Sequence, residues 1–344
     1  MVLMKNLGRG VWPVITVLMT LLVHGTSSAF TLEQVRDRDE LNCGVSPSLP
    51  GFSQADSEGT WYGFNVDICR AVAAAVLGDT GKVKFIPLNN NDSITSLLSG
   101  DVDLLSMNTE WNLSYDTSVG INFCGVSFYD GQGFMVAVKK GVNSILELDN
   151  SSICRDPTGP GVDGLDEFFT SHNLVYRNVE FDGYDGFYDA VQSGRCEVSS
   201  GNLSRLALLR MQLSQPEKYQ ILPETLSRRP LGPAVRQGDD GWFNIVRWVL
   251  FMLKIAEDEG LTSANLETMQ SSTNPDIRKL LGLEGVRGKG LGLPDDWVIQ
   301  IIRGVGNYGE IFDRNLGRNS PIKLDRNLNE IWSRGGLHYG PAVN

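Results

Sequence analysis

The segment Ser106–Tyr115 (SMNTEWNLSY) gathers side chains that could bind a small polar molecule. In chain order it supplies an amide, a carboxylate, an indole and a phenol: Asn108, Glu110, Trp111 and Tyr115. The amide and the phenol can exchange neutral hydrogen bonds, and the carboxylate can accept from a cation. Polar loops without any ligand are also common, so a merely solvated loop is the competing interpretation.

The residues before this segment indicate how it is positioned. Leu97–Leu98 closes an apolar helical pattern. Ser99–Gly100 ends that pattern, because Gly tolerates the left-handed conformation at a helix end. Val102–Leu105 then predicts a short strand, buried on both faces of a parallel sheet. Ligands of open α/β sheets bind at the carboxyl ends of strands, which is where Ser106–Tyr115 starts.

Residues 1–29 predict a secretory signal peptide. Lys5 and Arg9 give a positive start. Val11–Val23 is apolar, and small residues lead to a predicted cleavage site after Ala29. The apolar run has about 13 residues, whereas a helix that spans a bilayer needs roughly 20. Export therefore fits better than a membrane anchor.

The composition bounds the size and the partners of the exported chain. Its length of about 315 residues is more than one core usually supports, so two domains are expected. Without Lys5 and Arg9, 28 basic residues face 41 acidic ones. Nucleic acid and anionic membranes are poor partners for such an acidic chain. A hydrophobic content of 41% is that of an ordinary globular protein.

Cysteine usage favours disulfides over a metal site. Export places the five cysteines in an oxidising compartment, and an odd number leaves at least one free thiol. No cysteine or histidine spacing resembles a zinc site, and we expect no cofactor. Placement on the predicted elements favours Cys154–Cys196, on neighbouring strands, and Cys43–Cys69, between the first strand and the first helix. Cys124 then stays free and buried.

Strand and helix patterns alternate along the chain, which predicts parallel α/β sheets. The expected strands are Leu41–Val45, Val83–Pro87, Val102–Leu105, Phe134–Val138, Ser152–Cys154, Val175–Val179 and Cys196–Ser200. The expected helices are Phe64–Leu77, Asp92–Ser99, Leu165–Thr170, Tyr184–Gln192, Leu203–Leu213, Gly241–Glu259, Asp276–Leu281, Asp296–Gly304, Ile311–Asn315 and Leu328–Ser333.

One segment type occurs twice. Ser99–Asp103 and Ser193–Glu197 share a helix end, a Gly and an acidic residue that leads into a strand. They lie 94 residues apart, which is about the size of a small domain. Two βαβ halves of similar plan would produce this pattern. Chance is the alternative, because Ser-Gly ends many helices.

Several stretches together resemble the periplasmic solute-binding proteins of polar amino-acid ABC transporters (family 3), in particular the general L-amino-acid-binding subgroup. They are LNCGVS (Leu41–Ser46), GFNVDICRAVAAAVLGD (Gly63–Asp79), YDGQGFMV (Tyr129–Val136), PLGPAVRQGDDGWFNIVRW (Pro230–Trp248), NYGEIFDRN (Asn307–Asn315) and GGLHYGPA (Gly335–Ala342). The resemblance covers essentially the whole chain after residue 29.

The resemblance implies the α/β, two-lobe periplasmic-binding-protein fold (type II) with a helical C-terminal extension. Two crossover strands are expected near Phe134–Val138 and Leu231–Arg236. Lobe one would comprise residues 30–137 and 231–344, and lobe two residues 138–230. A small polar solute would bind between the lobes of a periplasmic monomer, and hinge closure would present it to an ABC permease.

The sequence departs from the family at the residues that grip an amino acid. The usual Arg falls on Tyr115, and a second Arg of the subgroup falls on Met107. The usual Thr-rich helix start falls on Asp156–Gly161, where two prolines remove N–H donors. The usual Asp falls on Asn202. We therefore expect a solute with less charge, and weak binding of free acidic and basic amino acids.

The expected ligand-binding residues are Leu49, Phe52, Asn108, Glu110, Trp111, Tyr115, Thr158, Gly159 and Asn202. Three alternatives stay open. Arg155 or Arg205 could replace the lost arginine, or the site could bind nothing. The protein could also be a sensor module, or a dehydratase-like enzyme that uses Glu110 as acid or base.

Overall fold

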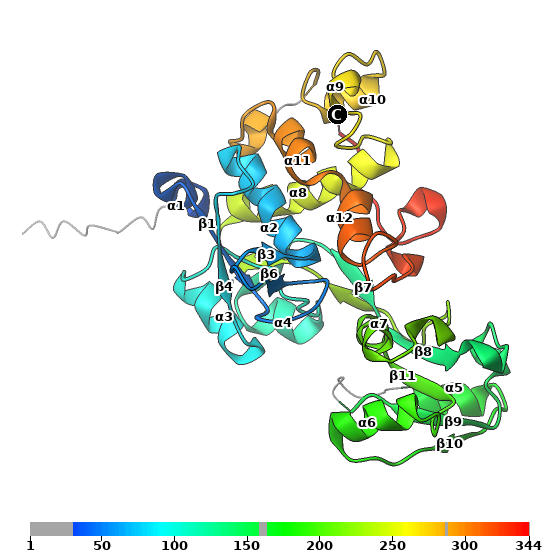
Figure 1. Cartoon of the computed structure of the whole chain (residues 1–344). Helices are drawn as coiled ribbons and strands as arrows, with labels where there is room; N and C mark the ends of the chain where they lie inside the picture. The colour runs from blue at the N-terminus through cyan, green and yellow to red at the C-terminus, as the bar shows by residue number, and fades with distance from the viewer. Residues whose placement is uncertain (1–29, 158–163, 286–287, 344) are drawn as a thin grey trace, which may run out of the picture.

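The computed structural model describes residues 30–157, 164–285 and 288–343. Within them the chain forms two bodies, each built on one five-stranded sheet and joined by a narrow connection (Figure 1). We name the body around the first sheet lobe one and the body around the second sheet lobe two. The predicted signal peptide, residues 1–29, lies outside the described residues. In the described part of the chain, no helix has the length and apolar character to cross a membrane.

The sheet of lobe one has the strand order β4-β1-β5-β14-β6. Its strands are β1 (Leu41–Val45), β4 (Val83–Pro87), β5 (Leu104–Leu105), β6 (Ile121–Phe123) and β14 (Ala234–Arg236). β1 pairs in parallel with β4 and β5, whereas β14 is antiparallel to β5 and β6. The carboxyl ends of β1 and β5 therefore meet at one edge of the sheet, which is where open α/β sheets bind ligands.

The sheet of lobe two has the order β10-β9-β11-β8-β12. Its strands are β8 (Gln132–Ala137), β9 (Ser151–Arg155), β10 (Tyr176–Asn178), β11 (Val198–Asn202) and β12 (Tyr219–Ile221). β9 pairs in parallel with β10 and β11, and β8 is antiparallel to β11 and β12. Both sheets thus share one plan. The repeated Ser-Gly segments precede β5 and β11, the equivalent strands, so the expectation of two similar halves is confirmed.

Helix α2 (Phe64–Leu77) forms the centre of lobe one and has the bounds that the sequence predicted. Almost all of its side chains are buried, and it packs against α8 (Asp240–Asp258) and α11 (Trp297–Val305). Gly63 starts it with φ 134°, and a Cβ there would lie 2.3 Å from the Phe52 carbonyl oxygen. The other elements of lobe one are α1 (Thr31–Arg38), β2 (Gln54–Ala55), β3 (Trp61–Tyr62), α3 (Asn90–Ser99), α4 (Leu113–Ser118), α9 (Leu266–Met269), α10 (Pro275–Leu280) and α12 (Tyr308–Asn315).

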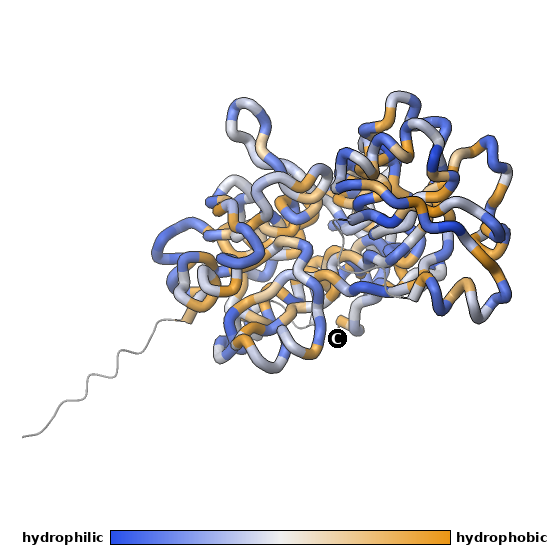
Figure 2. Tube along the Cα trace, turned by 90° about the horizontal axis from the view of Figure 1, so that it is seen from below, coloured by the Kyte–Doolittle hydropathy of each residue, from blue (hydrophilic) through white to orange (hydrophobic). Residues whose placement is uncertain are grey.

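Lobe two buries an apolar cluster on each face of its sheet. Along β8, Phe134 and Val136 join one cluster and Met135 joins the other, because successive strand residues point to opposite faces. Its helices are α5 (Leu165–Ser171), α6 (Gly183–Gln192) and α7 (Leu203–Gln212). Many of the outer loops of the molecule are hydrophilic, as Figure 2 shows.

Each lobe contains one disulfide. Cys43 of β1 is bonded to Cys69 of α2, with the Cα atoms 6.3 Å apart. Cys154 of β9 is bonded to Cys196, just before β11, with the Cα atoms 5.6 Å apart. These are the pairs that placement on the predicted elements favoured. Cys124 is free and buried, and burial raises the pKa of its thiol.

The chain passes between the lobes on two strands, β7 (Phe128–Asp130) and β13 (Arg229–Leu231), which pair antiparallel. The sequence placed the first crossing at Phe134–Val138, and that placement is wrong. Most of that stretch belongs to β8, which lies inside the second sheet, so lobe two starts near Gln132 instead of at residue 138. The second crossing likewise ends at Leu231, before β14 joins the first sheet.

The C-terminal segment, residues 326–338, is hydrogen-bonded to the first crossover strand, β7. The side chain of Asn329 accepts from the Tyr129 N–H (2.7 Å) and donates to the Tyr129 carbonyl (2.9 Å). The helix expected at Leu328–Ser333 is absent, since Asn327–Asn329 and Trp332–Arg334 form short 3₁₀ turns. Glu330, between them, is extended and breaks the helical path.

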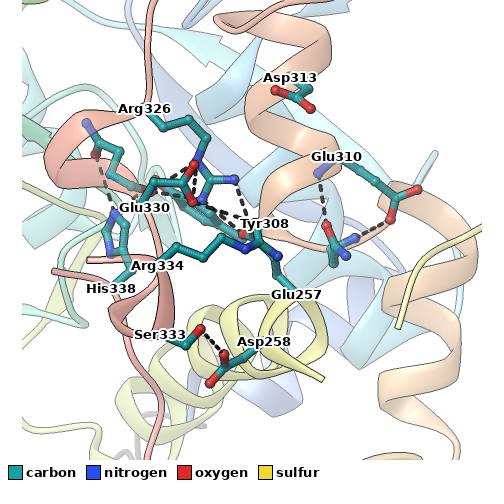
Figure 3. Close-up of polar contacts among 12 residues, drawn as sticks. Glu257, Asp258, Tyr308, Glu310, Asp313, Arg326, Glu330, Ser333, Arg334 and His338 are labelled. Carbon is teal, nitrogen blue, oxygen red and sulfur yellow. Dashed lines mark hydrogen bonds and ion pairs between the residues drawn. The ribbon is translucent and has the colours of Figure 1, made fainter. Parts of the chain in front are cut away.

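Charged and aromatic side chains fasten this segment to helix α8 (Figure 3). Arg326 and Arg334 both donate to Glu257 of α8, at 2.7 and 2.9 Å. The Tyr308 hydroxyl lies 2.9 Å from His338 Nε2 and donates to the carbonyl of Ser127, next to β7. Burial lowers the pKa of His338, and the charges of Lys254 and Arg326 lower it further.

His338 should make the protein less stable in mild acid. Its pKa is well below 6.5 in the folded state, whereas the unfolded chain binds a proton below about pH 6.5. The unfolding free energy should therefore fall below that pH, by at most about 1.4 kcal/mol per pH unit from this group. Urea unfolding at pH 7.5, 6.5 and 5.5 measures the slope.

The variant His338→Gln should lose this part of the slope. His172 is exposed, so His172→Gln is the matched control and should keep the slope of the native protein. An unchanged slope in His338→Gln would contradict the assignment.

Candidate ligand cleft between the lobes

A cavity of about 540 Å³ lies between the lobes, beside the two crossover strands. Lobe one lines it with the ends of β1 and β5 and with α3 and α4, and lobe two lines it with the start of α7. The residues used below are Leu49, Asn108, Glu110, Tyr115, Asp130, Asn202, Ser204, Arg205 and Arg229. The carboxyl ends of β5 and β11 both reach this cavity, as the topology predicts.

The segment after β5 runs along the crossover strand β13. Trp111 N–H donates to the Pro230 carbonyl (2.8 Å), and Gly232 N–H donates to the Thr109 carbonyl (3.2 Å). Asn108 has a positive φ of 57°, a conformation that Asn tolerates better than most residues. Its amide oxygen accepts from Asn65 Nδ2 at 2.9 Å. Backbone pairing thus fixes where Asn108 and Glu110 enter the cleft.

Tyr115 is presented by the short helix α4. Asn112 starts this helix, and its side-chain oxygen accepts from the Tyr115 N–H at 3.0 Å. The Tyr115 side chain lines the cleft and is 37% exposed. A phenol in this place offers a neutral hydrogen-bonding group.

Two charged residues at the base of the cleft form an ion pair. Arg229 of β13 donates to the Glu110 carboxylate through both Nε (3.1 Å) and Nη2. Both side chains are partly exposed, and both line the cavity. The pair joins the loop after β5 to the crossover, and it offers a solute charges of both signs.

Asp130, at the end of β7, brings a second carboxylate to the cleft. It accepts from the Ser204 hydroxyl (2.6 Å) and from the N–H groups of Gly131 (2.9 Å) and Ser204 (3.3 Å). Burial raises the pKa of this carboxyl, and the hydrogen bonds and the charge of Arg229 act against that rise. Asp130 thereby ties the crossover strand to the start of α7.

Lobe two contributes Asn202 and Arg205 to the cleft. Asn202 ends β11 and precedes α7, and its side chain makes no capping hydrogen bond to that helix. Arg205, one turn further, donates from Nε to the buried carboxylate of Asp156 at 2.8 Å. Asp156 therefore fixes the direction of an arginine whose side chain is 37% exposed at the cleft.

The structure brings five of the nine expected ligand residues into the cleft lining: Leu49, Asn108, Glu110, Tyr115 and Asn202. Two lie elsewhere. Phe52 is buried in the core against Phe64 and Phe128, because its ring serves lobe packing. Trp111 stacks on Phe123 of β6 at 5.7 Å and does not line the cavity. The remaining pair, Thr158 and Gly159, lies outside the described residues.

The expectation of an uncharged grip stays a prediction, because charged side chains line the cleft together with the neutral ones. Tyr115 and Asn202 do line the cleft, but Arg205 and Arg229 line it as well. Of the two candidate replacements for the family arginine, Arg155 points elsewhere and pairs with Asp166. Arg229 was missed, because its only sequence signal was a charge beside the Pro230–Arg236 stretch.

Two α/β lobes, two crossover strands and a cleft between them define a type II periplasmic binding protein. The chain belongs to family 3 of the bacterial extracellular solute-binding proteins, whose model matches residues 41–258. These proteins bind solutes outside the cytoplasm, and the two curated relatives described next are named as amino-acid-binding proteins.

The general L-amino acid-binding periplasmic protein AapJ of Rhizobium johnstonii is 46% identical over 92% of this chain and 94% of its own length. The glutamate/glutamine/aspartate/asparagine-binding protein BztA of Rhodobacter capsulatus is 44% identical, over 95% and 97%. A solved periplasmic binding protein from Brucella ovis with glutathione bound is 46% identical. That alignment has a TM-score of 0.75 and covers 92% of this chain and 100% of the other.

Replacing Asp130 should destabilise the connection between the lobes. In Asp130→Ala both carboxylate oxygens are lost, so the N–H groups of Gly131 and Ser204 and the Ser204 hydroxyl lose their common acceptor. We expect a loss of about 1–3 kcal/mol in unfolding free energy from urea titration. Asp189→Ala, on the exposed side of α6, is the control and should change little. Equal losses in both variants would contradict the role of Asp130.

Proposed function

We propose that the protein is the periplasmic solute-binding component of an amino-acid-type ABC transporter. It captures a small polar solute between its lobes and presents it to the membrane permease. The observation that carries the proposal is the cleft itself, since polar side chains from both lobes and from both crossover strands line one cavity. The relatives that match nearly the full chain support the same role.

The proposed solute differs from a free charged amino acid. Tyr115 and Asn202, at the usual anchor positions, offer neutral hydrogen bonds. The two arginines of the cleft are ion-paired, Arg229 with Glu110 and Arg205 with Asp156. A ligand carboxylate must compete with a partner that is already in place, which reduces its gain in binding energy. This arrangement favours zwitterionic or amide-bearing solutes, such as neutral amino acids and their derivatives.

Export, permease docking and a monomeric state complete the proposal. Residues 1–29 have the features of a cleaved signal peptide. The relative AapJ is named as periplasmic, and the Brucella ovis neighbour is described as an ABC transporter periplasmic binding protein. An enzymatic role is not favoured, because Glu110, the candidate acid or base, is held by Arg229. The relatives AapJ and BztA, which match nearly the whole chain, are named as binding proteins.

A ligand screen tests the proposal. The panel contains the neutral, acidic and basic L-amino acids, glutathione, opines and small amides. A solute at 100 times its Kd should raise the free energy of unfolding by about 2.7 kcal/mol. Thermal shift finds the binders and calorimetry measures Kd. We expect neutral or amide-bearing members to bind best. Micromolar binding of free glutamate or arginine would contradict the assigned chemistry, and the absence of any binder would contradict the function.

Variants at the two neutral positions test which groups touch the solute. Tyr115→Phe and Asn202→Ala each remove one hydrogen-bonding group, which should weaken the best binder about two- to tenfold. Asn202 makes no capping hydrogen bond, so its removal should leave α7 intact. Tyr339→Phe is the matched control, because Tyr339 is 64% exposed and lies outside the cleft lining. An unchanged Kd in both cleft variants would contradict these contacts.

A further inference from the structure

A second cavity, of about 300 Å³, adjoins the cleft at Arg205. Ser48, Leu49 and Arg205 line both cavities, so the two spaces meet at these residues. One wall is the Ser48–Pro50 loop of lobe one, and the other is formed by α6 and α7 of lobe two. Like the cleft, this groove therefore lies between the lobes.

The groove differs from the cleft in chemistry. Its α7 wall carries Arg205, Leu208, Leu209 and Gln212, which the 3.6-residue period places on one helix face. Leu208, Leu209 and Met211 make this wall mainly apolar, and Met211 is 38% exposed. At the α6 wall, the Tyr184 hydroxyl donates to Gln212 Oε1 at 2.9 Å. The groove is thus an apolar slot with an arginine at its entrance and a polar far end.

The wall formed by α7 is fixed from outside the groove. Arg210 Nη2 donates to the carbonyls of Ile322 and Lys323, both at 2.8 Å, and these belong to the C-terminal part of lobe one. At the entrance, the buried carboxylate of Asp156 directs Arg205. Such a pre-formed wall lets an apolar group bind without first paying the entropy of ordering the helix.

We propose that this groove is a subsite for an apolar arm of the solute, and that the solute is an amino-acid conjugate instead of a free amino acid. The inference rests on the proposed function and names its substrate class. The polar head lies in the cleft, an anionic or carbonyl group of the linker meets Arg205, and the arm lies along Leu208 and Met211. Cavities of 540 and 300 Å³ fall in the range that holds drug-sized ligands, which are larger than an amino acid.

Continuity with the cleft selects a solute arm as the occupant. The groove shares three lining residues with the cleft, and both lobes form its walls. A molecule bound in the groove would therefore contact both lobes, as a solute in the cleft does. A partner protein on this groove would also contact Ser48, Leu49 and Arg205, which belong to the cleft lining.

Two peptides that differ only in the arm test the inference. γ-Glutamyl-leucine and γ-glutamyl-glycine share a head, and glutamine serves as the free amino acid. Burial of the isobutyl arm should make γ-glutamyl-leucine bind at least about tenfold more tightly than γ-glutamyl-glycine by calorimetry. In Met211→Asp this preference should fall toward onefold, while the affinity for γ-glutamyl-glycine stays the same.

Leu146→Asp is the matched control, because Leu146 is 54% exposed in lobe two and lies outside both cavities. It should keep the tenfold preference. Equal binding of the two peptides, or an unchanged preference in Met211→Asp, would overturn the inference and leave the proposed function standing. Binding of glutamine without binding of either peptide would do the same. If neither the peptides nor any member of the amino-acid panel bind, the proposed function fails as well.

Discussion

The pairing of the two crossover strands is the constraint on which the rest of the structure depends. β7 and β13 come from distant parts of the chain, and their antiparallel register sets Asp130 opposite Arg229 and Phe128 opposite Leu231. The register therefore places two opposite charges at the base of the cleft and an apolar pair at the edge of lobe one. The loop after β5, the start of α7 and the side chain of Asn329 all bond to these strands or to their neighbours. The ligand cleft is in this sense built around the connection between the lobes.

Much of the fold could be predicted from local sequence patterns. Helix α2 and strands β1 and β4 have the bounds that periodicity and a terminal Gly indicated. The pairing of the crossover strands β7 and β13, and the 3₁₀ turns of the C-terminal segment, could not be predicted from local patterns. β7, Phe128–Asp130, is a short strand without a run of apolar residues. The apolar pattern of β8, a few residues later, is clearer, so the sequence pattern placed the crossover there. The 3₁₀ turns around Asn329 likewise depend on a tertiary bond to Tyr129, which no local propensity reports.

The candidate site was predictable where it follows a strand end or where the family resemblance marks a position. Tyr115 lies in the polar loop after a predicted strand, at the edge where such sheets bind ligands. The resemblance placed the usual Arg at Tyr115 and the usual Asp at Asn202, and both residues line the cleft. Arg229 reaches the same cavity from more than a hundred residues further along the chain, so its pairing with Glu110 is visible only in three dimensions. Phe52 and Trp111 show the opposite error, since an aromatic ring near a predicted cleft can serve the core equally well.

The central claim is that one solute binds between the lobes and contacts both of them. A crystal structure of the protein with the tightest-binding solute of the panel tests it most directly. The account predicts electron density for the solute in the cleft, within hydrogen-bonding distance of Tyr115 in lobe one and of Asn202 or Arg205 in lobe two. A solute bound on the outer surface, or one that touches a single lobe, would contradict it.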